Sequence, residues 1–157
     1  MKIYLFRVIK KLEDFNESNE KGIIMIRKIE HIGVAVKSLE GAEKFYSESL
    51  SIDILDREVH GDMKVSFLCV GETSIELLEG LSPDSVIAKF IEKRGEGIHH
   101  IAFEVDDIDK ALETLKKQGV SLIDQKPRSG AHNSRVAFLN PKAAHGILVE
   151  LVEPAKK

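Results

Sequence analysis

The chain has 157 residues, of which 43% are apolar and 31% are charged, and its formal net charge is −3. This length suits one compact domain with a sizeable core, and the slightly acidic balance does not indicate nucleic acid as a partner. No apolar stretch approaches the ~20 residues that span a bilayer, so we expect no membrane insertion and a cytoplasmic protein. The single cysteine, Cys69, lies in an apolar run, which predicts a buried structural thiol.

Residues 1–24 begin with an apolar and basic segment, continue with a polar stretch, and have no counterpart later in the chain. Met25 stands immediately before the first repeated segment. We therefore expect residues 1–24 to be an N-terminal extension outside the fold, and residues 25–157 to form a single domain.

The rest of the chain carries one pattern twice. Residues 29–36 (IEHIGVAV) alternate apolar with polar or small residues, as a half-buried strand does, and residues 98–105 (IHHIAFEV) repeat that pattern. A helical pattern follows each strand, capped by Ser38 or Asp107, and short strand-like runs follow each helix. The matched runs are 65–68 with 136–139, and 75–79 with 149–153.

These matches predict two strand-helix-three-strand units, at about 26–80 and 96–153. An amphipathic helix at about 82–94 connects them, and we expect Ser82 or Asp84 to cap it. One unit can hardly bury a face of its own sheet. We therefore predict an α+β fold in which tandem βαβββ units form one curved mixed sheet.

The duplication also pairs polar residues inside apolar strands. His31 matches His100, and Glu76 matches Glu150. A lone histidine or glutamate in a strand more often faces solvent, but four such groups at repeat-related positions are costly to bury without a compensating charge. We therefore predict a divalent metal site on the curved sheet, with cobalt, zinc, nickel, manganese or iron as suitable ions.

Other polar residues carry weaker signals. His99 neighbours His100 and should point to the opposite face of its strand, which indicates a structural or supporting role. Three histidines have no repeat partner and are expected to be loop residues: His60, His132 and His145. A basic group near the end of the chain is either a solvated face or a contact for phosphates, and it comprises Lys126, Arg128, Arg135 and Lys142.

The duplicated unit with paired His and Glu residues resembles the vicinal-oxygen-chelate superfamily and, within it, the methylmalonyl-CoA epimerases. The resemblance covers about residues 26–153. The segments that carry it are 31–36 (HIGVAV), 75–79 (IELLE), 84–90 (DSVIAKF), 97–103 (GIHHIAF), 138–142 (FLNPK) and 146–151 (GILVEL).

This resemblance implies a metal, cobalt first, held by the same four residues, and methylmalonyl-CoA as the substrate. It also implies that Glu150 acts as an acid or base, and we expect a homodimer. The family's second carboxylate lies in the strand after the first helix, but residues 63–67 (MKVSF) contain none. The second base is therefore unassigned, with Lys64 and a metal-bound water as candidates. The alternatives are a glyoxalase I-type lyase and a non-catalytic small-molecule-binding protein.

Overall fold

The computed structural model describes residues 24 and 26–155. The expected extension therefore lies outside the described residues, except for Ile24, which packs against the core of the second unit. None of the described helices is long and apolar enough to cross a membrane.

The described chain forms the two predicted units. The first comprises β1 (Ile26–Ala35), α2 (Leu39–Lys44) with its π-helical continuation η1 (Phe45–Ser49), β2 (Ile54–His60), β3 (Met63–Val70) and β4 (Thr73–Gly80). The helix α3 (Val86–Arg94) connects the units. The second comprises β5 (Gly97–Val105), α4 (Ile108–Lys117), β6 (Arg128–Ser129), η2 (Ala131–Asn133), β7 (Arg135–Leu139), η3 (Pro141–Ala144) and β8 (Leu148–Glu153).

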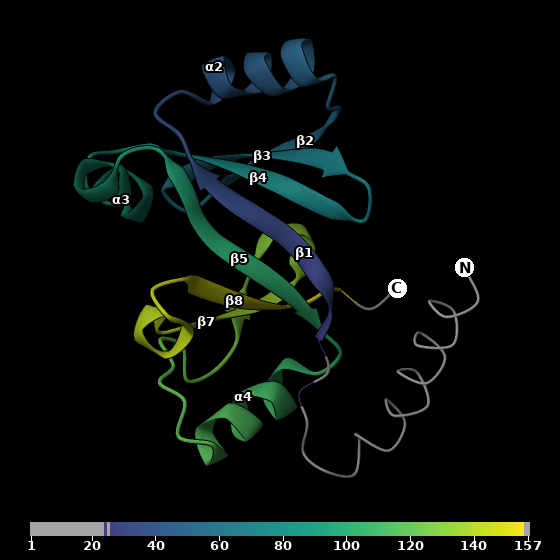
Figure 1. Ribbon diagram of the computed structural model, residues 1–157, viewed down its shortest axis with the longest axis vertical. Helices are drawn as coiled ribbons and strands as arrows, with labels where there is room; N and C mark the ends of the chain where they lie inside the picture. The colour runs from purple at the N-terminus through teal and green to yellow at the C-terminus, as the bar shows by residue number, and fades with distance from the viewer. Residues whose placement is uncertain (1–23, 25, 156–157) are drawn as a thin grey trace.

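All of these strands belong to one sheet, in the order β2-β3-β4-β1-β5-β8-β7-β6. The order within the second unit mirrors that of the first, and the antiparallel pair of β1 and β5 joins the two halves. In each unit the first strand runs parallel to the last, as β1 does to β4 and β5 to β8. Figure 1 shows the sheet curving around β1 and β5, with α2 and α4 on its outer side. The predicted curved mixed sheet is confirmed.

Each unit caps its own helix in the same way. The side chains of Ser38 and Asp107 accept hydrogen bonds from backbone amides in the first turns of α2 and α4, as predicted. A glutamate from the last strand adds a second cap: Glu79 accepts from the amide of Leu39 at 2.5 Å, and Glu153 from that of Ile108 at 3.0 Å. A carboxylate at a helix N-terminus also meets the positive end of the helix dipole, so it ties the helix to the sheet.

The apolar residues of the repeats divide between the two faces of the sheet. On the outer side, buried residues of α4 pack on β7 and β8, and Leu39 of the first unit packs on β3 and β4. On the inner side, Val65 and Phe67 form a smaller cluster with Ile87 of α3. The connecting helix therefore covers part of the concave face and borders the site described below.

Several sequence predictions were wrong. His60, expected in a loop, is the last residue of β2. The cap of α3 is neither Ser82 nor Asp84 but Ser85, which is buried and accepts a hydrogen bond from Ala88 N at 3.0 Å. Gly80 makes this possible, because a Cβ there would lie 2.1 Å from Ser85 Oγ. Cys69 is exposed rather than buried, because the covered part of β3 ends one residue before it.

Candidate metal and catalytic site

The register of the four central strands brings the predicted quartet together. Across the sheet, Glu76 on β4 pairs with Gly33 on β1, which pairs with His100 on β5. In a second row, His31 on β1 pairs with Ala102 on β5, which pairs with Glu150 on β8. Each row thus places a small residue between two polar ones. Gly33 and Ala102 occupy equivalent positions in the two repeats, so the pseudo-symmetry extends to the backbone beneath the site.

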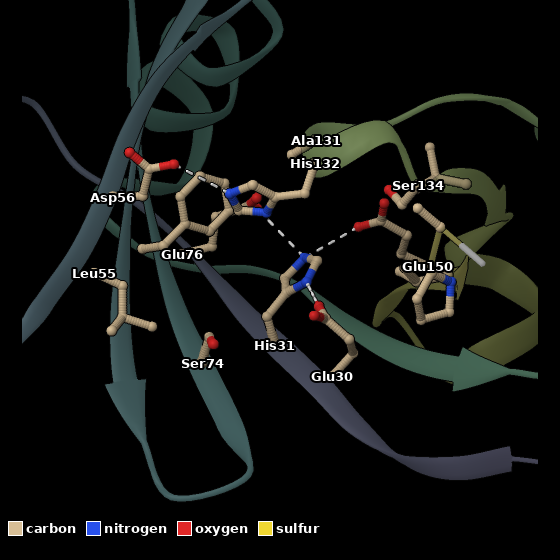
Figure 2. Close-up of a pocket in the computed structure, with 15 residues that line it drawn as sticks. Glu30, His31, Leu55, Asp56, Ser74, Glu76, Ala131, His132, Ser134 and Glu150 are labelled. Carbon is tan, nitrogen blue, oxygen red and sulfur yellow. Dashed lines mark hydrogen bonds and ion pairs between the residues drawn. The ribbon is translucent and has the colours of Figure 1, made fainter. Parts of the chain in front are cut away.

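The four side chains are buried and converge. Their exposed fractions are 7% for His31, 8% for Glu76, 4% for His100 and 6% for Glu150. The two Nε2 atoms of the histidines lie 2.8 Å apart, and Glu150 Oε2 lies 2.9 Å from His100 Nε2 and 3.3 Å from His31 Nε2. Glu76 Oε2 lies 3.3 Å from the Nε2 of His31 and 3.5 Å from that of His100. Figure 2 shows His31, Glu76 and Glu150 directed toward one another.

The separations among His31, His100 and Glu150 fit a single small cation. Imidazole nitrogens and carboxylate oxygens bind such ions at about 2.1 Å, which places neighbouring ligand atoms about 3.0 Å apart in octahedral and about 3.4 Å apart in tetrahedral geometry. The observed range of 2.8 to 3.5 Å spans both values. The donor atoms of His31, His100 and Glu150 all lie within 4.8 Å of one another. Glu76 lies within 3.5 Å of both histidine Nε2 atoms but is not part of that group of three. The donor set suits a borderline divalent ion.

The charges of the cluster are strongly coupled. Burial disfavours the charged imidazole of His31, but hydrogen bonds to Glu150 and Glu30 outweigh it and raise the pKa of His31 to about 10. Burial favours the neutral acid at Glu150, but hydrogen bonds from His100 and His31 outweigh it and lower the pKa to about 2. At Glu76 burial dominates and raises the pKa. The buried carboxylates therefore require a positive charge beside them, from a proton or from a cation.

Each histidine of the quartet has an outer partner at its other ring nitrogen. His31 Nδ1 is hydrogen-bonded to Glu30 Oε2, and the Nδ1 atoms of His100 and His99 lie 2.9 Å apart. Such partners orient a ligating ring and fix its tautomer. Burial, with the nearby His100, lowers the pKa of His99 to about 4 despite the opposing effect of Glu150. The prediction that His99 points to the face opposite His100 is wrong: the pairing of β1 with β5 is irregular between Gly33 and Val34, and both rings line one cavity. A supporting role for His99 stays a prediction.

Glu30 was missed because strand alternation places it on the face opposite His31. A register irregularity between Ile29 and His31 in the pairing with β5 disturbs that alternation. The carboxylate can then reach the neighbouring ring. The only sequence signal was a carboxylate directly before a predicted ligand histidine.

Two cavities flank the quartet, and four residues line both of them: Glu76, Ala131, Val136 and Glu150. The first, of about 340 Å³, extends past His31 toward Asp56 and His132 and is drawn in Figure 2. The second, of about 310 Å³, extends past His100 toward the β2–β3 hairpin, α3 and Arg128. Its other walls are mostly apolar and include Val65, Leu78, Ile87, Phe138 and Leu148.

The remaining candidate residues lie outside the quartet. His132 is held by Asp56 and Glu58, whose oxygens lie 3.4 and 3.3 Å from its Nε2, and it lines the first cavity. His145 is exposed at the end of η3. Lys64 pairs with Glu79 at 3.1 Å and lines neither of these two cavities.

Two members of the basic group are engaged in ion pairs. Arg135 pairs with Asp109 and Glu153, and Arg128 pairs with Asp124. Lys126 and Lys142 are exposed.

Comparison with known proteins identifies relatives of this architecture. Residues 30–138 match the family model of the Glyoxalase/Bleomycin resistance protein/Dioxygenase superfamily. The ethylmalonyl-CoA/methylmalonyl-CoA epimerase of Cereibacter sphaeroides is 41% identical over 132 residues, covering 81% of this chain and 98% of that protein. The crystal structure of methylmalonyl-CoA epimerase from Mycobacterium tuberculosis matches with a TM-score of 0.80 and 38% identity, covering 83% of this chain and 90% of that one.

A methylmalonyl-CoA epimerase solved in complex with methylmalonyl-CoA and NH4+ matches with a TM-score of 0.80 and 34% identity, covering 83% of this chain and 96% of that chain. The family model spans β1 to β7, and the relatives named above match 81 to 83% of the chain. The chain belongs to the Glyoxalase/Bleomycin resistance protein/Dioxygenase superfamily and, within it, to the family of the methylmalonyl-CoA epimerases.

Proposed function

We propose that this protein is a metal-dependent methylmalonyl-CoA epimerase, which interconverts the (R) and (S) forms by removing and returning the proton at carbon 2. One observation carries the proposal: four buried His and Glu side chains converge beside an apolar cavity, in a chain 41% identical to a named epimerase. The reaction requires stabilising a carbanion next to a thioester, and a site of this kind can meet that requirement.

We propose His31, Glu76, His100 and Glu150 as the metal ligands, with cobalt as the first candidate ion and zinc, nickel or manganese as alternatives. The distances among their donor atoms support this assignment. A bound divalent ion supplies Lewis-acid stabilisation of the negative charge that develops on the thioester oxygen. The Nδ1 contacts of the two histidines hold the rings with Nε2 directed inward.

We propose Glu150 as one of the two proton-transfer groups. Its carboxylate is ionised at neutral pH, since hydrogen bonds from both histidines lower its pKa to about 2 in spite of burial. It also forms part of the wall of the second cavity, so a substrate carbon placed there lies beside a carboxylate that can accept its proton. The apolar walls of that cavity exclude water from the enolate.

The test follows hydrogen exchange at carbon 2 of methylmalonyl-CoA in deuterated water, with cobalt-loaded, zinc-loaded and chelator-treated protein. We expect exchange and epimerisation with metal, loss of both after chelation, and recovery on metal addition. The hemithioacetal of methylglyoxal and glutathione is the matched control, since a glyoxalase I-type lyase would consume it. Turnover of the hemithioacetal without exchange of methylmalonyl-CoA would contradict the proposal.

We also propose that the protein acts in the cytoplasm as a homodimer. An apolar groove of about 440 Å³ runs between α3, β5 and the segment after η3, with Phe90, Ile98 and Ile147 in its walls. Ile98 is 62% exposed and Ile147 46% exposed in the single chain, which supports burial against a second copy. Light scattering of the wild type and of Ile98→Glu tests this, and a wild-type monomer at micromolar concentration would contradict it.

A further inference from the structure

Epimerisation requires a proton-transfer group on each side of the substrate carbon. The resemblance to the family places the second group in the strand after the first helix, where residues 63–67 contain no carboxylate. The strand β3 presents Val65 to the second cavity, and this valine is 2% exposed. Lys64 is not among the residues that line this cavity and is paired with Glu79. A side chain in this role would therefore come from another element that borders this cavity.

Few groups along the cavity wall can exchange a proton. Besides the quartet members, its titratable residues are His60, His99 and Arg128. Arg128 is paired with Asp124, and a guanidinium does not give up its proton in proteins. The ring of His99 is engaged with His100 through the 2.9 Å contact of their Nδ1 atoms. Only His60 remains.

The position of His60 in the hairpin suits this role. It is the last residue of β2 and pairs in register with Met63, which lines the same cavity. Strand alternation places it on the same face as Glu58, whereas Arg57 projects to the outer side and binds Glu43 of α2. His60 is half-buried, and in the described part of the chain its ring has no hydrogen-bond or ion-pair partner.

Glu58 is the nearest rival because it pairs in register with Val65. Its carboxylate is engaged by His132, with 3.3 Å between Oε1 and Nε2, and it is not part of the cavity wall. His60 comes from the first unit and Glu150 from the second, so the two border the cavity from opposite halves of the sheet.

We propose that His60 is the second catalytic residue and transfers a proton at carbon 2 on the face opposite Glu150; this assignment rests on the proposed epimerase function. In one direction the Glu150 carboxylate takes the proton, the C–H bond breaks, an O–H bond forms, and the electron pair passes into the thioester enolate. The protonated His60 imidazole then gives its N–H proton to carbon 2 from the other side. The protein is left with protonated Glu150 and neutral His60, which are the forms that run the reverse reaction.

The test uses the full-length, metal-loaded protein and each epimer of methylmalonyl-CoA separately in deuterated water, corrected for the rate without enzyme. For His60→Gln we expect epimerisation to fall by roughly 10²–10⁴-fold, with metal content and melting temperature unchanged. Deuterium exchange should persist for the epimer whose proton faces Glu150 and be lost for the other. Imidazole added to His60→Ala should restore the lost exchange. The exposed His145→Gln is the control and should behave as wild type.

Several results would overturn the assignment. An epimerisation rate of His60→Gln within about threefold of wild type would exclude His60. So would the expected loss of epimerisation if it appeared in Glu58→Gln and not in His60→Gln. Equal loss of exchange for both epimers would mean that His60 binds substrate rather than transferring a proton. If the wild type exchanges neither epimer, the proposed function itself is wrong and the role of His60 falls with it.

Discussion

A methyl group at Gly33 should remove metal binding while leaving the fold in place. Gly33 has ordinary strand backbone in the central pair of β1 and β5, opposite His100. A Cβ at this position would lie 2.2 Å from Cε1, 2.5 Å from Nδ1 and 2.8 Å from Nε2 of His100. Because three ring atoms are too close at once, the whole ring of His100 has to move away from β1.

The size of the required shift sets the expected effect. Carbon atoms in contact lie at least about 3.5 Å apart, so the His100 ring must move by about 1.3 Å, whereas metal–ligand bonds tolerate about 0.2 Å. We therefore expect Gly33→Ala to bind the metal at least about 100-fold more weakly. Removing a group that is only hydrogen-bonded to a metal ligand already lowers metal affinity by about 10–100-fold. Overpacking should lower the free energy of unfolding by about 1–3 kcal/mol.

Metal titration by calorimetry and thermal unfolding of the metal-free protein would measure the two effects separately. Gly41→Ala is the matched control, because a Cβ on this helical glycine meets Ser38 at 3.5 Å, an ordinary contact. It should keep the metal and gain up to about 1 kcal/mol of stability. If Gly33→Ala bound one ion per chain with wild-type affinity, the steric reasoning and the role of His100 as a ligand would both be refuted.

Four further predictions concern the two glutamates of the quartet, the uptake of metal, the cap of α2 and the N-terminal segment. Glu150→Gln should lose roughly 10²–10⁴-fold in turnover yet retain metal, whereas Glu76→Gln should lose less turnover. Steady-state rates measure both, and equal small losses would mean that Glu150 is a ligand only. Metal binding at pH 7 should release a proton and weaken as pH falls, because the pKa of His31 is about 10 and the metal displaces the proton of its ring. Calorimetry in buffers of different ionisation enthalpy measures the number of protons released. Glu79→Gln should cost about 1 kcal/mol in denaturant unfolding above pH 5. The pKa of Glu79 in the folded state is lowered below 4.5 by its hydrogen bond to the helix amide, so this cost should shrink as pH falls through the folded value, and a constant cost would contradict the cap. Deleting residues 1–23 should leave metal content and melting temperature unchanged, and a large drop in melting temperature would place that segment on the core.

Much of the architecture and of the site could be read from local patterns. The two copies of the strand-helix-three-strand unit were visible because apolar periodicity and cap residues act over a few neighbouring positions, as at Ser38 and Asp107. Duplication then paired His31 with His100 and Glu76 with Glu150 without knowledge of the sheet order. The observed strand register brings these four side chains together.

Other features depended on contacts between segments far apart in the sequence, and only the tertiary structure decided them. Ser85 caps α3 because Gly80 leaves room for it, and Cys69 is exposed because the covering elements end before it. The role inferred for His60 required knowing that the β2–β3 hairpin borders the same cavity as β8. Local patterns determine which face of a strand a residue occupies, whereas the register, the irregularities of pairing and the packing of loops determine what that face meets.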